Sequence, residues 1–412
     1  MENSEIILMR ITGEDRPDII TLITSILAKY DVTILDIGQA DIHNTFSLGI
    51  MFQTIESHSG QVMKELLFQA SELALNIRFF PVSREEYTAW VGMQGKNRYI
   101  LTLLGRKLSA SQIAAVTKVV AEHGMSIDAI RRLSGRIPLD DERANVRACI
   151  ELSVRGTLRD RDKMHAKLMK LSTKLEMDFS FQADNMYRRM RRLICFDMDS
   201  TLIQTEVIDE LAARAGVGDV VSEITAQAMR GEIDFKESFV RRVALLKGLD
   251  SSVMKDIAEN LPLTEGMDRL MFALKSYGYK IAIISGGFTF FCNYLKRHYN
   301  IDYVYANELE IGIDGRLTGG YVGEIIDGKR KAELLRQIAQ VENVDLQQTI
   351  AVGDGANDLP MLTEAGLGIA FHAKPKVAAN AGQAINTIGI DGVLYFLGFR
   401  DSYLDENDSK KF

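Results

Sequence analysis

Cysteine is scarce in this chain, and the few that occur form no pattern. The 412 residues contain three cysteines, Cys149, Cys195 and Cys292, which are scattered, and two of them lie within apolar runs. Three scattered cysteines fit neither a disulfide framework nor a zinc site. The pattern is typical of buried free thiols in a reducing compartment.

Three other features are also missing. Residues 1–5 contain neither a basic leader nor an apolar signal core. No uninterrupted apolar stretch reaches the ~20 residues that a membrane span requires. The net charge of −7 lacks the basic excess that nucleic-acid binding calls for. We therefore expect a cytoplasmic protein with neither a membrane nor a nucleic acid as partner, and we interpret the one basic cluster, Arg188, Arg189, Arg191 and Arg192, as a solvated linker.

The first ~185 residues contain a weak internal repeat. Each copy has the predicted order β-α-β-β-α-β, which is the ferredoxin-like arrangement. In the first copy the elements are expected at 5–11, 19–30, 32–41, 46–52, 61–73 and 76–80, and in the second at 99–104, 111–123, 126–133, 146–154, 161–175 and 177–181. A linker is expected over residues 84–96.

Beyond this repeat, two carboxylates follow a short apolar run. Leu193-Ile194-Cys195-Phe196 predicts a buried strand of a parallel sheet, and Asp197-Met198-Asp199-Ser200-Thr201 comes directly after it. In open α/β folds, ligands bind at the carboxyl ends of such strands. Two neighbouring acids repel each other unless a cation or a shared proton lies between them, and Mg²⁺ with oxygen ligands meets that need.

Three later elements appear in a fixed order after this motif. Ser285-Gly286-Gly287 follows a second apolar run and offers a hydroxyl and free backbone amides to a phosphate. Lys331 lies near the start of a helical pattern. Gly353-Asp354-Gly355-Ala356-Asn357-Asp358 follows a third apolar run and adds two carboxylates and an amide. Each element alone has an ordinary structural explanation, but the ordered set is highly specific.

The ordered set resembles the haloacid-dehalogenase superfamily of phosphotransferases, over residues ~190–400. The intervening residues narrow the resemblance to the phosphoserine phosphatase family: Glu206, Phe235, Arg242, Phe288 and the run His372-Ala373-Lys374-Pro375-Lys376 look like motifs of that family. The resemblance implies Mg²⁺-dependent hydrolysis of O-phospho-L-serine to L-serine and phosphate through an aspartyl-phosphate, the last step of serine biosynthesis.

The resemblance also implies a role for each catalytic residue. Asp197 would be the nucleophile, and Asp199 would protonate the leaving oxygen and later activate water. Asp197, the backbone carbonyl of Asp199, and Asp354 would hold Mg²⁺, with Asp358 at or just behind the metal. Ser285, Gly286 and Lys331 would stabilise the phosphate oxygens.

Substrate recognition is expected from residues outside the phosphate site. Glu206 would pair with the substrate ammonium, and Arg242 would bind the carboxylate through two parallel hydrogen bonds. Met229 and Phe235 would supply apolar walls, and Asn357 would contact the phosphate or orient its loop. His372 is expected to be structural rather than a base.

Two smaller segments accompany the catalytic sheet. Apolar residues recur at helical spacing between ~205 and ~265, which predicts a helical cap. Asp314-Gly315 between apolar residues over 309–317 predicts a hairpin that would form a flap. The residues from 401 to 412 are polar, and we expect them to be disordered.

The repeated N-terminal copies resemble ACT domains, which bind amino acids and pack sheet to sheet. The turn 12–17 looks like the opening turn of that family. Where effector-binding members carry glycine, the first copy has Asp18, whose charge would repel an amino acid's carboxylate. Gly105 stands in the turn of the second copy, so serine binding is expected there if anywhere. The alternative is that both copies only assemble a homodimer.

The expected architecture is α/β: a C-terminal doubly wound parallel sheet with a helical cap, preceded by two ferredoxin-like α+β domains. The predicted boundaries are 1–85, 97–183 and 190–400, followed by the tail 401–412. Two other functions remain open: the same chemistry on another phosphomonoester or a phosphoprotein, and an ACT-based amino-acid sensor.

Overall fold

The structure, a computed structural model, describes residues 4–93, 97–136 and 146–404. It divides into two compact units, residues 1–96 and 97–412. All three cysteines are buried and free, as predicted. Among the described residues, no helix combines the length and the apolarity that a membrane span needs.

The first unit is a four-stranded antiparallel sheet with helices on one face. Its strands run in the order β2-β3-β1-β4, with each neighbouring pair antiparallel. Buried residues alternate along β1, where Met9 and Ile11 face a core shared with Ile23 and Leu66 of the helices. The elements are β1 Ser4–Glu14, α1 Ile19–Lys29, β2 Thr33–Ile42, β3 Thr45–Ile55, α2 Glu56–Glu72, β4 Asn76–Val82 and α3 Arg84–Val91.

Helix α3 lies in the segment that we expected to be a linker. Ser83 and Glu86 form a capping box, in which Glu86 N donates to Ser83 Oγ at 3.1 Å and Ser83 N donates to Glu86 Oε2 at 2.9 Å. The Ser-x-x-Glu spacing marks such a helix start. The segment 84–96, which we expect to be a linker, therefore contains a helix over residues 84–91, and residues 94–96 lie outside the described part.

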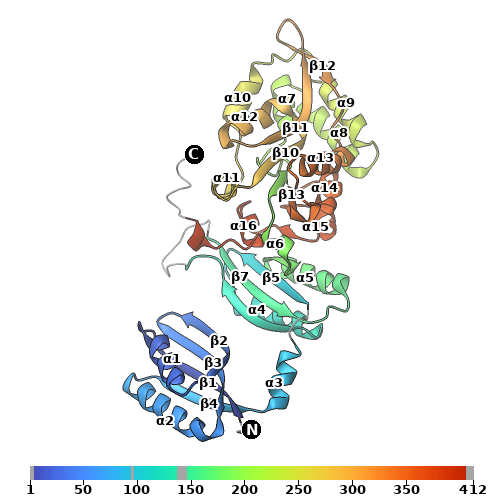
Figure 1. Cartoon of the computed structure of the whole chain (residues 1–412). Coiled ribbons are helices and arrows are strands. Elements are labelled where there is room, and N and C mark those ends of the chain that lie inside the picture. The colour runs from blue at the N-terminus through green and yellow to red at the C-terminus, as the bar shows by residue number, and fades with distance from the viewer. Residues whose placement is uncertain (1–3, 94–96, 137–145, 405–412) are drawn as a thin grey trace. The chain divides into compact units, whose positions relative to one another are not determined.

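The second unit begins with the other ferredoxin-like copy. Its antiparallel strands run β8-β5-β7-β6, and helices α4 and α5 pack on them (Figure 1). The elements are β5 Arg98–Gly105, α4 Ala110–Glu122, β6 Ser126–Arg132, β7 Ala148–Arg155, α5 Arg161–Leu175, β8 Asp178–Ala183 and α6 Met186–Arg189.

A parallel sheet with a helical cap follows in the same unit. The sheet elements and their helices are β9 Leu193–Phe196, α11 Met267–Ser276, β10 Lys280–Phe288, α12 Thr289–Tyr299, β11 Tyr303–Ile311, β12 Leu317–Val322, α13 Gly328–Val341, η1 Leu346–Gln348, β13 Thr349–Gly353, η2 Ala356–Asp358, α14 Leu359–Glu364, β14 Leu367–Phe371, α15 Pro375–Ala381, β15 Ala384–Ile385, α16 Gly392–Phe396 and η3 Asp401–Tyr403. The cap comprises α7 Val207–Ala215, α8 Gly218–Arg230, α9 Phe235–Ala244 and α10 Val253–Glu259.

Strand β9 lies between β10 and β13 and is parallel to both. All four of its side chains are buried because helices cover both faces of the sheet: Ile194 and Phe196 face the core formed by α11, α12 and α16, while Leu193 and Cys195 face α13 and α14. This explains why the strand is a continuous apolar run rather than an alternating one. The predicted hairpin is present as β11 and β12, with Gly315 at φ 75° in its turn.

The two sheets of this unit join into one sheet of eleven strands, which the sequence did not indicate. Ala384 of β15 pairs with Phe179 of β8, and the Gln383 side chain extends the junction by accepting from Phe181 N and donating to Phe181 O. On the neighbouring side, the buried Asp178 carboxylate accepts from Asn386 N and Thr387 N. No break in the sheet therefore separates the second ferredoxin-like copy from the catalytic part.

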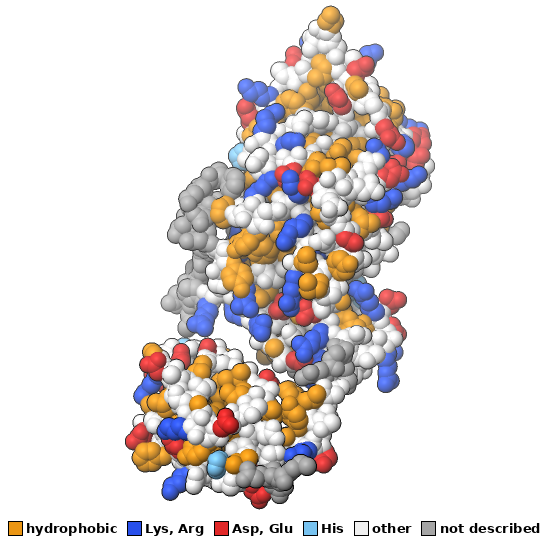
Figure 2. Space-filling model, in the orientation of Figure 1, with side chains coloured by type: hydrophobic (Ala, Val, Ile, Leu, Met, Phe, Trp, Pro, Cys, Tyr) orange, Lys and Arg blue, Asp and Glu red, His pale blue; other side chains and the backbone are white. Residues whose placement is uncertain are grey.

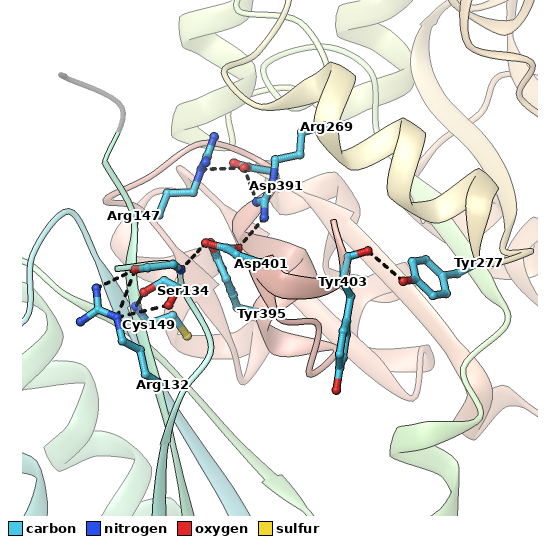
Figure 3. A network of polar contacts seen from close by, with 11 residues as sticks. Arg132, Ser134, Arg147, Cys149, Arg269, Tyr277, Asp391, Tyr395, Asp401 and Tyr403 are labelled. Carbon is cyan, nitrogen blue, oxygen red and sulfur yellow. Dashed lines mark hydrogen bonds and ion pairs between the residues drawn. The ribbon is translucent and has the colours of Figure 1, made fainter. Parts of the chain in front are cut away.

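A buried ion cluster closes the same junction (Figure 3). Asp391 has no exposed side-chain surface, and its Oδ2 lies 2.7 Å from Arg147 Nε and 2.8 Å from Arg269 Nη1. Arg269 Nη2 also lies 2.6 Å from Asp401 Oδ1, which accepts from Tyr395 as well. The cluster therefore joins the second ferredoxin-like copy, helix α11 and the C-terminal segment.

Two expectations from the sequence are corrected here. Residues 401–404, expected to be disordered, contain η3, and Asp401 accepts hydrogen bonds from Gly135 N, Arg269 and Tyr395; residues 405–412 lie outside the described part. The basic cluster 188–192 is not a solvated linker throughout, because Arg188 and Arg191 are buried. Arg188 is buried in an ion pair with Glu151 at 2.8 Å.

Candidate active site

The strand-end motifs meet at one edge of the parallel sheet. Asp197 directly follows β9, and Asp197 N donates to Val352 O of β13 at 2.9 Å. Ser285 lies in β10 on the other side of β9, and Asp354 follows β13. Because these strands are parallel neighbours, their carboxyl ends bring together residues that lie more than 150 positions apart in the sequence.

Three carboxylates and one ammonium form the centre of this edge. Asp197, Asp354 and Asp358 each offer an oxygen, and these oxygens lie within 4.8 Å of one another. The fully buried Lys331 of α13 places its Nζ 2.9 Å from Asp197 Oδ1 and 2.7 Å from Asp358 Oδ1. One lysine cannot neutralise three carboxylates, so the cluster carries an excess of negative charge.

The pKa values reflect this excess. Burial, together with Asp197, Asp358 and Glu206, raises the pKa of Asp354 to about 8. Burial and Asp197 raise the pKa of Asp358 to about 6, although Lys331 opposes the shift. Burial lowers the pKa of Lys331, but Asp197 and Asp358 raise it by more, so the lysine remains an ammonium. Carboxylate oxygens in such an arrangement are suitable ligands for a hard divalent cation.

Asp199 lies beside this cluster and is not one of the three grouped carboxylates. Its Oδ1 accepts from Val207 N at 3.3 Å, at the start of cap helix α7. Burial, followed by Glu206 and Asp197, raises its pKa well above the ordinary value. A carboxyl group whose pKa is raised keeps its proton to higher pH, and this suits it to donate a proton.

The turn at the end of β10 faces these acids. Gly287 N donates to Ser285 Oγ at 2.9 Å, and Ser285 is fully buried. A Cβ on Gly287 would lie 2.5 Å from Asp199 Oδ2, so only glycine lets the turn approach this acid so closely. A Cβ on Gly286 would lie 3.0 Å from the Phe235 ring, which shows that the cap reaches this turn.

The two expected substrate-recognising residues lie on the cap side. Glu206 precedes α7, and Ser200 Oγ donates to its Oε1 at 2.8 Å. Burial lowers the pKa of Arg242, while Glu206, Asp209 and Asp199 raise it, so the guanidinium lies within the field of these acids. Its hydrogen bonds go to Ser238 O and Thr225 Oγ1, and no ion pair within 4.0 Å engages it in the described part of the chain. The guanidinium thus remains free to bind a carboxylate.

The remaining predicted residues are less closely involved. Asn357 lies in η2, with its Oδ1 against Gly355, and Gly328 at the start of α13 packs against its carbonyl. Met229 is in α8, but its side chain lies outside the described part. His372 follows β14, and its Nε2 lies 2.9 Å from Ile388 O. Gly105 ends β5 in the ferredoxin-like copy and is not among the residues gathered at this edge.

One buried residue of the site had no signal in the sequence. Asn307 of β11 is 2% exposed; its Nδ2 donates to Gly286 O at 2.8 Å, and its Oδ1 accepts from Ile326 N at 2.8 Å. It therefore fixes the orientation of the Gly286 peptide. A lone asparagine in a strand is not distinctive, so only the fold reveals this contact.

Comparisons with known proteins agree with this geometry. Residues 191–366 match the model of the haloacid dehalogenase-like hydrolases, and residues 5–80 and 98–182 each match an ACT-domain model.

Similarity to two curated proteins covers nearly the whole chain. It is 38% identical over 407 residues to the phosphoserine phosphatase of Streptomyces coelicolor, covering 98% of this chain and 94% of that protein. It is 35% identical over 410 residues to phosphoserine phosphatase SerB2 of Mycobacterium tuberculosis, covering 98% and 95%. A crystal structure of a haloacid-dehalogenase family hydrolase from Salmonella enterica serovar Typhi gives a TM-score of 0.62 at 31% identity, covering 72% of this chain and 98% of that one.

Proposed function

The chain belongs to the phosphoserine phosphatase family of haloacid dehalogenase-like hydrolases with two ACT domains, and on this premise we propose that it hydrolyses O-phospho-L-serine to L-serine and phosphate in the cytoplasm, as the last step of serine biosynthesis. The observation that carries the proposal is that the Arg242 guanidinium, which forms no ion pair with a described residue, interacts electrostatically with Glu206 and Asp199. Arg242 and Glu206 complement the carboxylate and the ammonium of phosphoserine.

In the proposed mechanism, Asp197 is the nucleophile. Its Oδ1 accepts from Met198 N at 2.8 Å and pairs with Lys331, so Oδ2 is the oxygen left to attack phosphorus. Attack forms a P–O bond to Asp197 as the bond to the seryl oxygen breaks, and the protonated Asp199 donates its proton to that oxygen. Asp199 then accepts a proton from the water that cleaves the aspartyl-phosphate.

The phosphate oxygens need stabilisation while charge develops on them. Ser285, the Gly286 turn and Lys331 supply a hydroxyl, backbone amides and an ammonium for this purpose. Asn357 would contact the phosphate or hold its loop. Phe235, which lies against Gly286, would exclude water when substrate is bound, and we assign the same role to Met229.

The acid cluster fits a magnesium ion. Asp197, Asp354 and the backbone carbonyl of Asp199 would hold it, with Asp358 just behind because its Oδ1 and Oδ2 already accept from Lys331 and Gly355 N. Bound Mg²⁺ would neutralise the phosphate and the carboxylates.

Phosphate release from a panel of esters tests the proposal. We expect phosphoserine to be hydrolysed far faster than phosphothreonine, a phosphopeptide or an ester without an amino-acid head group, and EDTA to abolish the activity. Equal rates across the panel would instead favour a general phosphomonoesterase. No activity on any ester would favour an amino-acid sensor.

Removal of the metal should make stability depend on pH in a defined direction. Asp354 and Asp358 have folded-state pKa values of about 8 and about 6, above the ordinary 3.8, so the metal-free folded state binds more protons than the unfolded state. We therefore expect the Tm in EDTA to fall as the pH rises from about 5 to 8. Mg²⁺ should raise the Tm more at pH 8 than at pH 5, because fewer protons compete with it. An effect of Mg²⁺ that did not vary with pH would contradict this account of the cluster.

For the ACT pair we propose assembly into a homodimer. In the first unit, β2 is an edge strand with Ile34, Ile37 and Ile42 42%, 48% and 79% exposed, and hydrophobic side chains are visible on this unit in Figure 2. In the second copy, β6 is also an edge, with Ile130 exposed. Unpaired, partly apolar edges favour burial against another chain.

The domain division 1–85, 97–183 and 190–400 is part of the same proposal.

A regulatory role would place serine at the Gly105 turn. Asp18 at the corresponding turn of the first copy has φ 74°, a conformation that favours glycine, but it carries a charge that opposes a carboxylate. Next to Gly105, Arg106 forms two hydrogen bonds of 2.7 and 2.6 Å with Glu265, where the chain leaves the cap. A ligand at this turn would therefore act close to the cap connection.

Calorimetry with L-serine tests this role on the full chain carrying Arg242→Ala, which weakens serine binding at the catalytic site. We expect the remaining binding to be lost with Gly105→Ala and kept with Asp18→Gly. The alanine Cβ would lie 3.5 Å from Lys107 O and 3.6 Å from Glu176 O, so the variant should fold. If serine does not bind to the Arg242→Ala chain, the ACT pair serves assembly alone.

A further inference from the structure

A cavity of about 520 Å³ lies where the second ferredoxin-like copy meets the catalytic sheet. Its wall comes from the end of β8, the α6 segment, the start of β14, and helices α14 and α15. Arg191, which precedes β9, also lines it. Asp197 and Asp354 follow the carboxyl ends of β9 and β13, whereas this cavity lies at the amino ends of β9 and β14. It is therefore separate from the candidate active site.

The charged side chains that line the cavity are both positive. Arg161 and Arg191 both line it, and no aspartate or glutamate of the described chain is among its lining residues. The other polar groups of the wall include the amides of Gln182, Asn185 and Gln347. In a chain with a net charge of −7, an acid-free wall with two arginines is unusual in composition.

Arg191 is a buried cation that forms no ion pair with a carboxylate among the described residues. The residue is 5% exposed, and its Nε and Nη1 are buried without a hydrogen bond from any described residue. No carboxylate of the described chain lies within 4.0 Å of its guanidinium. Burial, followed by the nearby positive charge of Arg188, lowers its pKa to about 10, and the neighbouring Tyr279 phenol opposes this shift without supplying a permanent negative charge.

Two neighbouring arginines differ from Arg191 because each has a carboxylate partner. Arg188 is as deeply buried, but it pairs with Glu151 at 2.8 Å. Arg189 is 71% exposed and lies 3.4 Å from Asp184. Glu151 and Asp184 thus pair with Arg188 and Arg189, and Arg191 has no carboxylate partner among the described residues.

An uncompensated buried guanidinium is costly. Buried charges in native proteins are paired, and a buried donor without a partner calls for a missing ion, water or ligand. An arginine presents parallel N–H groups that match the oxygens of a carboxylate or a phosphate. The wall also holds one unpartnered buried acceptor, Gln182 Oε1, which a hydrogen-bond donor on the same ligand would satisfy.

We propose that this cavity binds a small oxyanion, through a carboxylate or a phosphate group, with Arg191 as its counter-ion and Arg161 at the rim. The two sources of this chemistry are free phosphate and the carboxylate of an amino acid. Because β8 belongs to the second ferredoxin-like copy and β14 to the catalytic sheet, the ligand would bridge the two parts. The inference does not depend on the proposed substrate.

The test is calorimetry on the full chain in EDTA, with inorganic phosphate and L-serine as separate probes. Without a metal, the negative cluster around Asp197 disfavours phosphate at the active site. We expect Arg191→Met to weaken binding of one of these probes at least tenfold. Arg189→Met removes the same charge two residues away and should leave the affinity unchanged. If Arg191→Met weakens the binding of phosphate alone, the anion is phosphate. If it weakens the binding of serine alone, the anion is the carboxylate of an amino acid.

Stability measurements supply a second readout. Without the probe, Arg191→Met should unfold at the same or a higher temperature than the parent, because it removes an unpaired buried charge, and the probe should no longer raise its Tm. If Arg191→Met does not fold, the exposed Arg161→Met should still weaken binding several-fold. The proposal is overturned if neither probe binds to the parent in EDTA, or if the arginine variants bind both probes as Arg189→Met does.

Discussion

Asp197→Asn should abolish turnover of phosphoserine while leaving the protein folded. The amide is nearly isosteric with the carboxylate, but it cannot attack phosphorus and is a poor metal ligand. Loss of a nucleophile removes the covalent route altogether, so we expect kcat to fall by about 10³-fold or more. In EDTA the Tm should be equal to or above that of the parent, because one charge leaves a cluster in which Asp199, Asp354 and Asp358 repel it, while Lys331 keeps its partner Asp358.

A surface change of the same chemistry provides the control. Asp256 on cap helix α10 is 57% exposed and pairs with Arg214, so Asp256→Asn should retain the parent kcat. Beryllium fluoride mimics a phosphoryl group on an aspartate; it should inhibit the parent and fail to bind Asp197→Asn. Substantial turnover by the Asp197 variant would refute the covalent mechanism.

Arg242→Ala should reduce activity on phosphoserine far more than activity on a phosphate ester without a carboxylate. The guanidinium is free of ion pairs with the described residues, and only a substrate with a carboxylate can use it. Loss of one partner of a buried charge pair costs about 2–5 kcal/mol, which corresponds to roughly 30- to 4,000-fold in kcat/KM. We expect a decrease of this size for phosphoserine and a much smaller one for p-nitrophenyl phosphate, which has no amino-acid head group.

The adjacent arginine is a matched control for this experiment. Arg241 lies on the same helix, is 49% exposed and pairs with Glu237, so Arg241→Ala should leave both substrates nearly unaffected. If Arg242→Ala reduced kcat/KM by the same factor for both substrates, Arg242 would be structural. The assignment of phosphoserine would then lose its main support.

The candidate site shows which parts of a fold a linear sequence encodes. Asp197, Ser285 and Asp354 were recognisable because each follows or ends a short, fully apolar run, and such runs are parallel strands buried on both faces. The carboxyl ends of parallel strands share one edge, so local patterns were sufficient to predict that these distant residues meet. Asn307 carries no such local mark, and its role depends on where β11 lies beside β10.

The errors have a common origin in contacts between distant segments. The basic run 188–192 and the polar segment after residue 400 are hydrophilic, and by composition alone such segments are solvated. In the fold, Glu151 lies beside Arg188. Asp401 accepts hydrogen bonds from Gly135 N, Arg269 and Tyr395, and Figure 3 shows Arg269 and Tyr395 next to it. Glu151 lies 37 residues from Arg188 in the sequence, and Arg269 and Gly135 lie 132 and 266 residues from Asp401, so no local pattern predicts these contacts.

By itself the sequence determined most element types, the strand-end acids and the glycine turn at Ser285-Gly286-Gly287, because these depend on local periodicity and local sterics. Tertiary structure alone decided that the second ferredoxin-like sheet continues into the catalytic sheet through Ala384 and Phe179, and that Asp391 is buried between Arg147 and Arg269. It also left Arg191 buried without a carboxylate partner in the described part of the chain. The physical reason is that the free energy of a charge depends on what surrounds it, and those surroundings come from chain segments that the sequence places far apart.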